Sequence, residues 1–445
     1  MRMENDREAY AFSENVRLVP AYMPEPFGTH HTKMLVLFSA DATGGGAGAR
    51  GGGATGMCRV IIHTANMIPF DWGNMTQGVW DSGWLPPLSP SAQVPTIGAE
   101  FKSSLLTYLR AYGSARTGEL IKEVPKYDFS TVRAVFLGST PGRHKLDSCP
   151  FGWPALQRIL SKVSIPENSR AKVVMQLSSI ATLTQGGKDT WFTPVFCKAL
   201  AATAPISGKK PKPKPDFALI FPTPDEIRQS LNGYESGGAV HLKLSSKASL
   251  LQLEYLKPIL CRWSARSEPP SPSTITKSTP SSSSAKLPSK TYTPSYRALA
   301  APHIKTYIRF QNPLSSSRDF GPSSTISWAL LTSANLSTQA WGSAPTAPAK
   351  EVRISSYEAG VLVFPELFKD ETHSKRVVMT PVFHEDVGGT DQGKGEGGGE
   401  DVIKVDIRIP YDMPLTPYSK TETPWTPGGT YDEPDWMDRR YDPAG

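Results

Sequence analysis

The strongest constraint on this chain is a short pattern that occurs twice. In each copy a histidine, with a lysine two residues later, stands at the mouth of an apolar run, and an asparagine follows a second apolar run 32 or 35 residues further on. The two sets are His31, Lys33 and Asn66, and His303, Lys305 and Asn335. Both asparagines end a small-Ala-Asn triplet and precede a tryptophan by six residues, at Trp72 and Trp341. We therefore predict two related halves.

The His-x-Lys pair alone is weak evidence, because it occurs four times in the chain. His241 with Lys243, and His373 with Lys375, have no asparagine and tryptophan at the matching distance. We interpret these two pairs as solvated strand edges. The other two pairs carry the functional hypothesis.

Strand geometry suggests what the repeat could build. Residues i and i+2 of a strand face the same side, so His31 and Lys33 should project together, as should His303 and Lys305. If the copies pack face to face about a pseudo-twofold axis, one site gains two imidazoles, two ammonium groups and two carboxamides. That set suits a phosphodiester: the cations and amides bind its oxygens, one imidazole attacks phosphorus, and the other transfers protons.

This chemistry needs no metal and no cofactor. No cluster of acidic residues accompanies the motifs, and the four cysteines show no zinc spacing: Cys58, Cys149, Cys197 and Cys261. Widely spaced cysteines also favour free thiols in a reducing compartment.

The net charge of +7 and the pI of about 9.0 make an acidic partner plausible. No stretch is apolar for long enough to span a membrane, so we expect a soluble protein.

Short β-branched runs alternate with helical patterns, for example at 101–112 and 153–163, which favours an α/β architecture with layered sheets. Three segments look like insertions: a glycine loop at 43–56, a Ser/Pro-rich stretch at 264–298 and a second glycine-rich loop at 387–401. The lysine-rich run at 208–217 is interpreted as a solvated linker.

Longer strings around the motifs resemble one family. "FGTHHTKM", "TQGVW", "PHIKTYIR", "TSANLSTQAWG" and "SYEAGVL" are similar to the fungal tyrosyl-DNA phosphodiesterases of the phospholipase D superfamily. Lipid-cleaving members of that superfamily carry an aspartate five residues after each motif lysine, where this chain has Phe38 and Phe310. The resemblance implies two similar α/β lobes in an α-β-α-β-α layering: an N-terminal lobe at 1–143, a C-terminal lobe at 144–436 and a tail at 437–445.

The resemblance also implies roles for individual residues. His31 would be the nucleophile that forms a covalent phosphohistidine, and His303 the general acid and later the general base. The expected phosphate ligands are Lys33, Lys305, Asn66 and Asn335, and the expected ring partners of the histidines are Gln77 and Glu358. Phe27 would stack on a DNA base, and three serines would contact the substrate: Ser178, Ser179 and Ser337. We expect His30 to face away, and Trp72 and Trp341 to belong to the core.

The function implied is hydrolysis of the 3′-phosphotyrosyl bond between DNA and a trapped topoisomerase I peptide, by a nuclear monomer. The expected partners are therefore DNA with 3′-phosphotyrosyl or other 3′-blocked ends, and the peptide itself. Two alternatives stay open: a related enzyme that clears other 3′ adducts from DNA or RNA, and a catalytically impaired DNA-binding paralogue. Only thirty residues precede His31, so we expect the first lobe to lack its opening strands and helices.

Overall fold

The computed structural model describes residues 16–39, 56–89, 96–166, 168–183, 186–204, 214–265, 293–316, 319–369, 375–383 and 402–443. Most of the glycine loop at 43–56, most of the stretch at 264–298, all of the loop at 387–401 and most of the lysine run lie outside these residues. Within the described residues no helix has the length and apolarity that crossing a lipid bilayer requires.

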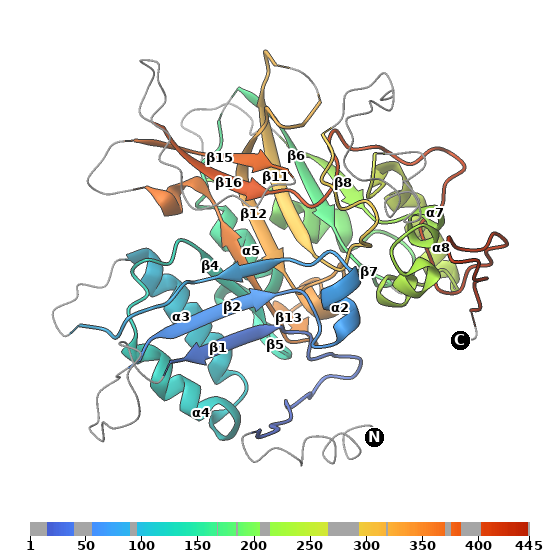
Figure 1. Cartoon of the computed structure of the whole chain (residues 1–445). Helices are drawn as coiled ribbons and strands as arrows, with labels where there is room; N and C mark the ends of the chain where they lie inside the picture. The colour runs from blue at the N-terminus through green and yellow to red at the C-terminus, as the bar shows by residue number, and fades with distance from the viewer. Residues whose placement is uncertain are drawn as a thin grey trace.

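A nine-stranded mixed sheet forms the centre of the molecule (Figure 1). Seven strands follow one another in the order β10-β8-β6-β11-β12-β14-β4, β15 also pairs with β12, and β16 pairs with β15. Its members are β4 (Val135–Ser139), β6 (Ser169–Gln176), β8 (Asp216–Ile220), β10 (Leu260–Cys261), β11 (Thr306–Pro313), β12 (Thr325–Thr332), β14 (Glu358–Val363), β15 (Arg376–Val382) and β16 (Val402–Arg408). The central strands β11 and β12 are almost wholly buried, as the apolar sequence of β12 predicts, although β11 also buries Arg309, Gln311 and Asn312.

A second, three-stranded antiparallel sheet lies beside the first (Figure 1). It has the order β1-β2-β3 and contains β1 (Met34–Phe38), β2 (Cys58–His63) and β3 (Val79–Asp81). Two short ribbons complete the strands: β5 (Gly142–Lys145) with β13 (Glu351–Ile354), and β7 (Ser179–Ile180) with β9 (His241–Leu242).

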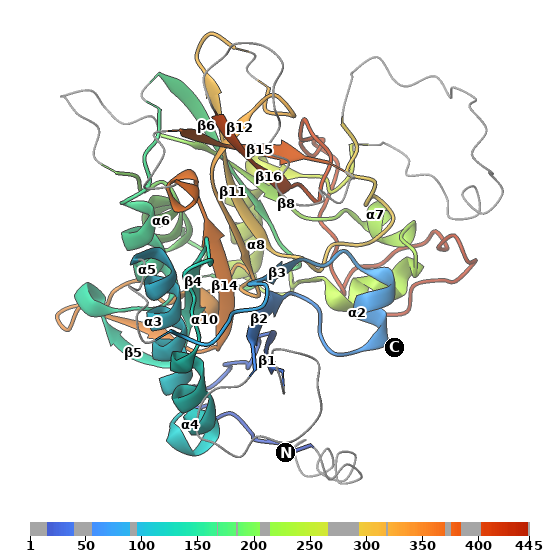
Figure 2. The same cartoon turned by 60° about the vertical axis from the view of Figure 1, so that its left-hand side comes forward.

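Helices cover the large sheet, and α3 and α5 pack on β4 (Figure 2). The α-helices are α2 (Pro69–Asn74), α3 (Thr96–Arg110), α4 (Ser114–Glu123), α5 (Gly152–Leu160), α6 (Lys198–Leu200), α7 (Pro224–Arg228), α8 (Lys247–Leu256) and α10 (Thr338–Trp341). Shorter turns of 3-10 helix, and one π-helical turn at Phe192–Cys197, connect them. The α/β class with layered sheets is confirmed.

The repeat seen in the sequence is also a repeat in the structure. In each copy the lysine directly precedes a strand, and that strand pairs antiparallel with the strand before the asparagine, β1 with β2 and β11 with β12. The register is the same: Met34 lies opposite Ile62, and Thr306 lies opposite Leu331, each partner being four residues before its asparagine. A short helix, α2 or α10, begins three residues after each asparagine.

The two copies nevertheless belong to sheets of unequal size. In the described part of the chain the first copy contributes a sheet of three strands, whereas the second belongs to the sheet of nine. β4 comes from the range assigned to the N-terminal lobe, yet it pairs with β14 of the large sheet. The two predicted ranges therefore share a sheet, and the division at residue 143 stays a prediction.

Candidate active site

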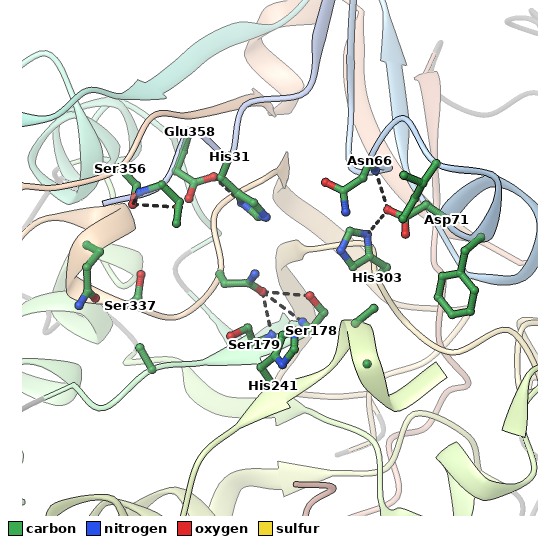
Figure 3. Close-up of a pocket in the computed structure, with 18 of the residues that line it drawn as sticks. His31, Asn66, Asp71, Ser178, Ser179, His241, His303, Ser337, Ser356 and Glu358 are labelled. Atoms are coloured by element: carbon green, nitrogen blue, oxygen red, sulfur yellow. Dashed lines mark hydrogen bonds and ion pairs between the residues drawn. The ribbon is translucent and has the colours of Figure 1, made fainter. Parts of the chain in front are cut away.

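The two copies meet at a cleft of about 790 Å³ (Figure 3). Most of the predicted site residues line it: Phe27, His31, Asn66, Ser178, Ser179, His303, Asn335, Ser337 and Glu358. The other three, Lys33, Lys305 and Gln77, do not line the cleft, and both lysines are buried. The structure thus brings both motifs together, with the imidazoles at the surface of the cleft and the cations behind them.

His31 is held by the second copy. Its backbone N–H donates to the carbonyl of Tyr357 at 3.0 Å, and its Nδ1–H donates to Oε2 of the next residue, Glu358, at 2.9 Å. Glu358 also accepts a hydrogen bond of 2.5 Å from Ser333. Burial alone would raise the pKa of Glu358, but His31, Ser333 and Lys33 together hold it below its ordinary value. The carboxylate therefore stays ionised, fixes the tautomer of His31 and leaves Nε2 as the nucleophilic nitrogen.

His303 is held by the first copy in the same way. Its backbone N–H donates to the carbonyl of Thr76 at 3.1 Å, and its Nδ1 lies 3.1 Å from Nε2 and 3.2 Å from Oε1 of the next residue, Gln77. Thr64 donates to Oε1 of Gln77 at 2.7 Å, as Ser333 does to Glu358. Each histidine therefore takes its backbone acceptor and its ring partner from the opposite copy.

Asp71 breaks this symmetry, and the sequence analysis missed it. Its side chain is buried on α2, its Oδ2 lies 3.3 Å from Nδ1 of His303, and it accepts a hydrogen bond of 2.5 Å from the backbone N–H of Asn66. Both histidines thus have a carboxylate within reach of Nδ1, Glu358 for one and Asp71 for the other. Asp71 can stabilise the imidazolium form of His303, which Gln77 alone cannot do.

The Asp71→Asn variant should show this role. Loss of the carboxylate removes part of the general-acid contribution, which is about 10²–10⁴ in total, so we expect a fall in kcat of about tenfold to hundredfold with little change in KM. Asp81→Asn is the matched control, since Asp81 pairs with Arg59 on the surface and does not line the cleft. Equal kcat values for the two variants would contradict the assignment.

The two lysines occupy equivalent positions beneath their histidines. Nζ of Lys33 donates to the carbonyl of His31 at 2.9 Å, and Nζ of Lys305 donates to the carbonyl of His303. Burial lowers the pKa of Lys33 to about 8, and burial together with Lys33 holds the pKa of Lys305 well below its ordinary value. Burial, with Lys305 and Lys33 nearby, also lowers the pKa of His303. A bound anion would raise all three pKa values, so the entry of a phosphate favours the protonated forms of these groups.

The asparagines differ in what holds them. Oδ1 of Asn335 accepts hydrogen bonds from the backbone N–H groups of Ser178 and Ser179, at 3.2 and 2.9 Å, and from the Ser178 hydroxyl at 3.4 Å. With its oxygen satisfied, Asn335 can turn its amide N–H groups to the cleft. Asn66 is exposed, and its backbone is fixed by Asp71.

The residues predicted at the edge of the cleft lie in different surroundings. Phe27 is 90% exposed at the cleft, which excludes a packing role and fits a stacking platform. The Ser337 hydroxyl lies at the cleft and caps α10 by accepting from Ala340 N–H at 3.0 Å. His30 turns to Tyr112, with Nε2 2.9 Å from its hydroxyl, and does not line the cleft.

One prediction from the sequence is wrong, and another is incomplete. Trp341 is buried, as predicted, but Trp72 is 51% exposed and contacts His63, because the short helix α2 buries only Asp71. His241 is exposed on strand β9, as we interpreted it, but it also lines the cleft (Figure 3). Its position comes from the pairing of β9 with β7, which no local pattern predicts.

Comparison with known proteins agrees with this geometry. A family model described as tyrosyl-DNA phosphodiesterase matches residues 1–419, which is most of the chain. The chain belongs to the tyrosyl-DNA phosphodiesterase family. It is 28% identical to the probable tyrosyl-DNA phosphodiesterase of Schizosaccharomyces pombe, covering 95% of this chain and 79% of that one. It is 30% identical to tyrosyl-DNA phosphodiesterase 1 of Drosophila melanogaster, covering 93% of this chain and 60% of the fly protein.

Solved structures agree on the fold. The crystal structure of yeast tyrosyl-DNA phosphodiesterase superposes with a TM-score of 0.60 at 22% identity, over 92% of this chain and 80% of the yeast chain. The predicted phospholipase D-like fold is therefore confirmed.

In the described part of the chain, no group of three or more His, Cys, Asp or Glu side chains is arranged to hold a metal ion.

Proposed function

We propose that this chain hydrolyses the bond between a DNA 3′-phosphate and a tyrosine, through a phosphohistidine on His31. Family membership supports a hydrolase of the phosphodiesterase class that acts in DNA repair. The observation that carries the proposal is the pair of imidazoles facing one cleft, each with a carboxylate within reach of its Nδ1. A phosphodiester bound between them would have a nucleophile on one side and a proton donor on the other.

In the first step Nε2 of His31 attacks phosphorus, and the bond from phosphorus to the tyrosine oxygen breaks. The leaving phenolate takes a proton from Nε2 of His303, which returns to the neutral form. Lys33, Lys305, Asn66 and Asn335 supply positive charge and N–H donors for the oxygens on which charge develops. Binding of the anionic phosphate favours the protonated His303 that this step requires, because it offsets the two lysine charges.

In the second step neutral His303 accepts a proton from water as the water oxygen attacks phosphorus. The P–N bond breaks, so that His31 is regenerated and the DNA keeps a 3′-phosphate. A phenol has a pKa near 10 and leaves more readily than a sugar alkoxide, which favours tyrosine as the group expelled. We infer that the physiological leaving group is a topoisomerase I-derived peptide in the nucleus. Both half-sites lie on one chain, so a monomer suffices.

The deciding experiment is a single-turnover assay on a single-stranded oligonucleotide that carries a 3′-phosphotyrosine, in excess EDTA. Release of tyrosine with formation of a 3′-phosphate supports the proposal. Tight binding of the oligonucleotide without release would contradict it and favour the DNA-binding paralogue. A preference for other 3′ adducts in direct competition would favour the related end-processing enzyme.

The apparent affinity for a phosphate should depend on pH because of Lys33. Its pKa of about 8 means that the ammonium form is complete well below that pH and is lost as the pH rises through it. Since the anion needs the charged form, affinity should fall by up to about tenfold per pH unit above pH 8. The check is the inhibition constant of an oligonucleotide with a 3′-phosphate, and an affinity unchanged to pH 9.5 would contradict the role of Lys33.

The Phe27→Ala variant tests the stacking platform. Phe27 is 90% exposed, so its removal should leave the melting temperature unchanged. Stacking is worth about 1–3 kcal/mol per base, so affinity for single-stranded DNA should fall by about fivefold or more. Tyr22→Ala, at another exposed aromatic residue outside the cleft, is the matched control. An unchanged dissociation constant for Phe27→Ala would exclude stacking.

A further inference from the structure

The repeat places one more pair of side chains at equivalent positions, a hydroxyl two residues before each asparagine. These residues are Thr64 and Ser333, and both are 1% exposed. The backbone N–H of Thr64 donates to the carbonyl of Gly78 at 3.1 Å, and the Thr64 hydroxyl accepts the N–H of Gly78 at 2.9 Å. Ser333 makes the same two bonds to Ala359, at 2.9 and 3.0 Å. Each hydroxyl is therefore held beside the residue that contacts a histidine ring.

These contacts decide the direction of one further hydrogen bond. A hydroxyl whose oxygen accepts an N–H has a single hydrogen left to donate. Thr64 gives that hydrogen to Gln77 at 2.7 Å, and Ser333 gives its own to Glu358. The atom that each hydroxyl meets must therefore be an acceptor. Both ends of the Glu358 carboxylate accept, whereas in the Gln77 amide only the oxygen does.

The amide of Gln77 is consequently fixed at both ends. Its Oε1 accepts from Thr64, and its Nε2 donates to the backbone carbonyl of Asp71 at 3.2 Å. Nδ1 of His303 lies 3.2 Å from Oε1 and 3.1 Å from Nε2, so distance alone does not decide which end it bonds. Oε1 has a second lone pair for a ring N–H, and it bonds Nδ1 only when that nitrogen carries a hydrogen.

The orientation of this amide matters because His303 has to work in its neutral form as well. A neutral ring with its hydrogen on Nδ1 presents the lone pair of Nε2, which is what accepting a proton from water requires. A reversed amide would offer an N–H to Nδ1 and favour the hydrogen on Nε2, so the base would be lost. The Asp71 carboxylate, 3.3 Å from Nδ1, favours the same tautomer as Oε1, so reversal should cause a partial loss.

We propose that Thr64 is a positioning residue, whose hydroxyl keeps the oxygen of the Gln77 amide toward His303 and so keeps Nε2 of the neutral ring available as the base. Ser333 occupies the equivalent place without this task, since a carboxylate has no donor end to exclude. The kinetic consequence rests on the proposed function, whereas the position of the ring hydrogen does not depend on it.

Nitrogen-15 NMR of the histidine-labelled protein measures the position of that hydrogen, and His303→Ala identifies the signals. Burial, with Lys305 and Lys33 nearby, lowers the pKa of His303, so the ring of the free protein is neutral above neutral pH. The wild type should carry the hydrogen on Nδ1. Thr64→Val replaces the hydroxyl by a methyl group of similar size, and a share of its molecules should carry the hydrogen on Nε2.

Turnover should follow the ring hydrogen. Thr64→Val should lower kcat by about threefold to tenfold at an unchanged KM, the effect of losing one neutral hydrogen bond. Thr64→Ser, which retains the hydroxyl, should recover most of that loss. Adding Thr64→Val to Gln77→Glu should lower kcat by less than about twofold, because a carboxylate at position 77 has no donor end. Ser333→Ala is the matched variant, and it should leave the tautomer of His31 unchanged.

Three results would overturn the inference: a hydrogen on Nε2 of His303 in the wild type, unchanged ring signals in Thr64→Val, or an equal loss of kcat with and without Gln77→Glu. Thr64→Ala replaces Thr64→Val if that variant does not fold, and the wild-type spectrum needs neither.

Hydrolysis by the wild-type chain separates this inference from the proposed function. If the wild type releases tyrosine and the ring signals do not respond to Thr64, the positioning role is wrong and the function stands. If the signals respond and no tyrosine is released, Thr64 orients the amide as inferred and the function is wrong.

Discussion

His31→Ala should abolish both turnover and the covalent intermediate. Loss of a catalytic nucleophile lowers kcat by about 10⁴-fold or more, because no neighbouring group can take its place in line with the leaving group. His303 cannot substitute, since its ring is held by Gln77 and Asp71 on the opposite side of the cleft. The measurement is a single-turnover assay, with a denaturing gel to detect labelled DNA bound to protein.

The matched control for His31→Ala is His30→Ala. His30 is the adjacent histidine, but it contacts Tyr112 and does not line the cleft, so this variant should keep most of the wild-type rate. Binding of a 3′-phosphate oligonucleotide should be retained by both variants. A DNA–protein adduct that forms in His31→Ala would assign the nucleophile to another residue.

His303→Ala should separate the two steps. Without the general acid and base, overall turnover should fall by about 10²–10⁴. The phenolate can leave without full protonation because its conjugate acid has a pKa near 10, whereas attack by water needs a base. We therefore expect the phosphohistidine to form slowly and to break down more slowly still, so that it accumulates on the gel.

The adduct in His303→Ala should be stable to denaturant and should be released by acid, as a phosphorus–nitrogen bond is. The double variant His31→Ala/His303→Ala should form none. If His303→Ala loses activity and no adduct appears at any time, the first step itself requires His303, and the predicted accumulation of the phosphohistidine would be wrong.

The repeat explains why so much of the site could be predicted from the sequence. It marks the residues that both copies share, and the structure places those residues at equivalent positions: Lys33 and Lys305 each donate to the carbonyl of their own histidine. Gln77 and Glu358 lie at different distances after their asparagines, 11 and 23 residues, because the second copy inserts the strand β13 before Glu358. These two were identified through the family resemblance, and spacing would not have identified them.

The residues that make the two halves different were missed for the same reason. Asp71 has Ala340 as its counterpart, so a comparison of the copies discards it. His241 lies outside both copies and reaches the cleft through a two-residue ribbon. Trp72 was expected in the core together with Trp341, but the short helix α2 buries Asp71 and leaves Trp72 exposed. Long-range packing decided each of these positions, and a local pattern carries no information about it.

Each copy of the repeat supplies the side chains that bind the imidazole ring of the other copy's histidine, so the two halves of the site depend on each other. His31 is oriented by Glu358, and His303 by Gln77 and Asp71, so each half of the chain supplies what orients the other's histidine. A chain in which the copies have not yet docked has two unoriented imidazoles and no assembled anion site. A partly folded molecule is therefore catalytically inactive. The capacity to attack phosphodiesters arises only when the tertiary structure is complete.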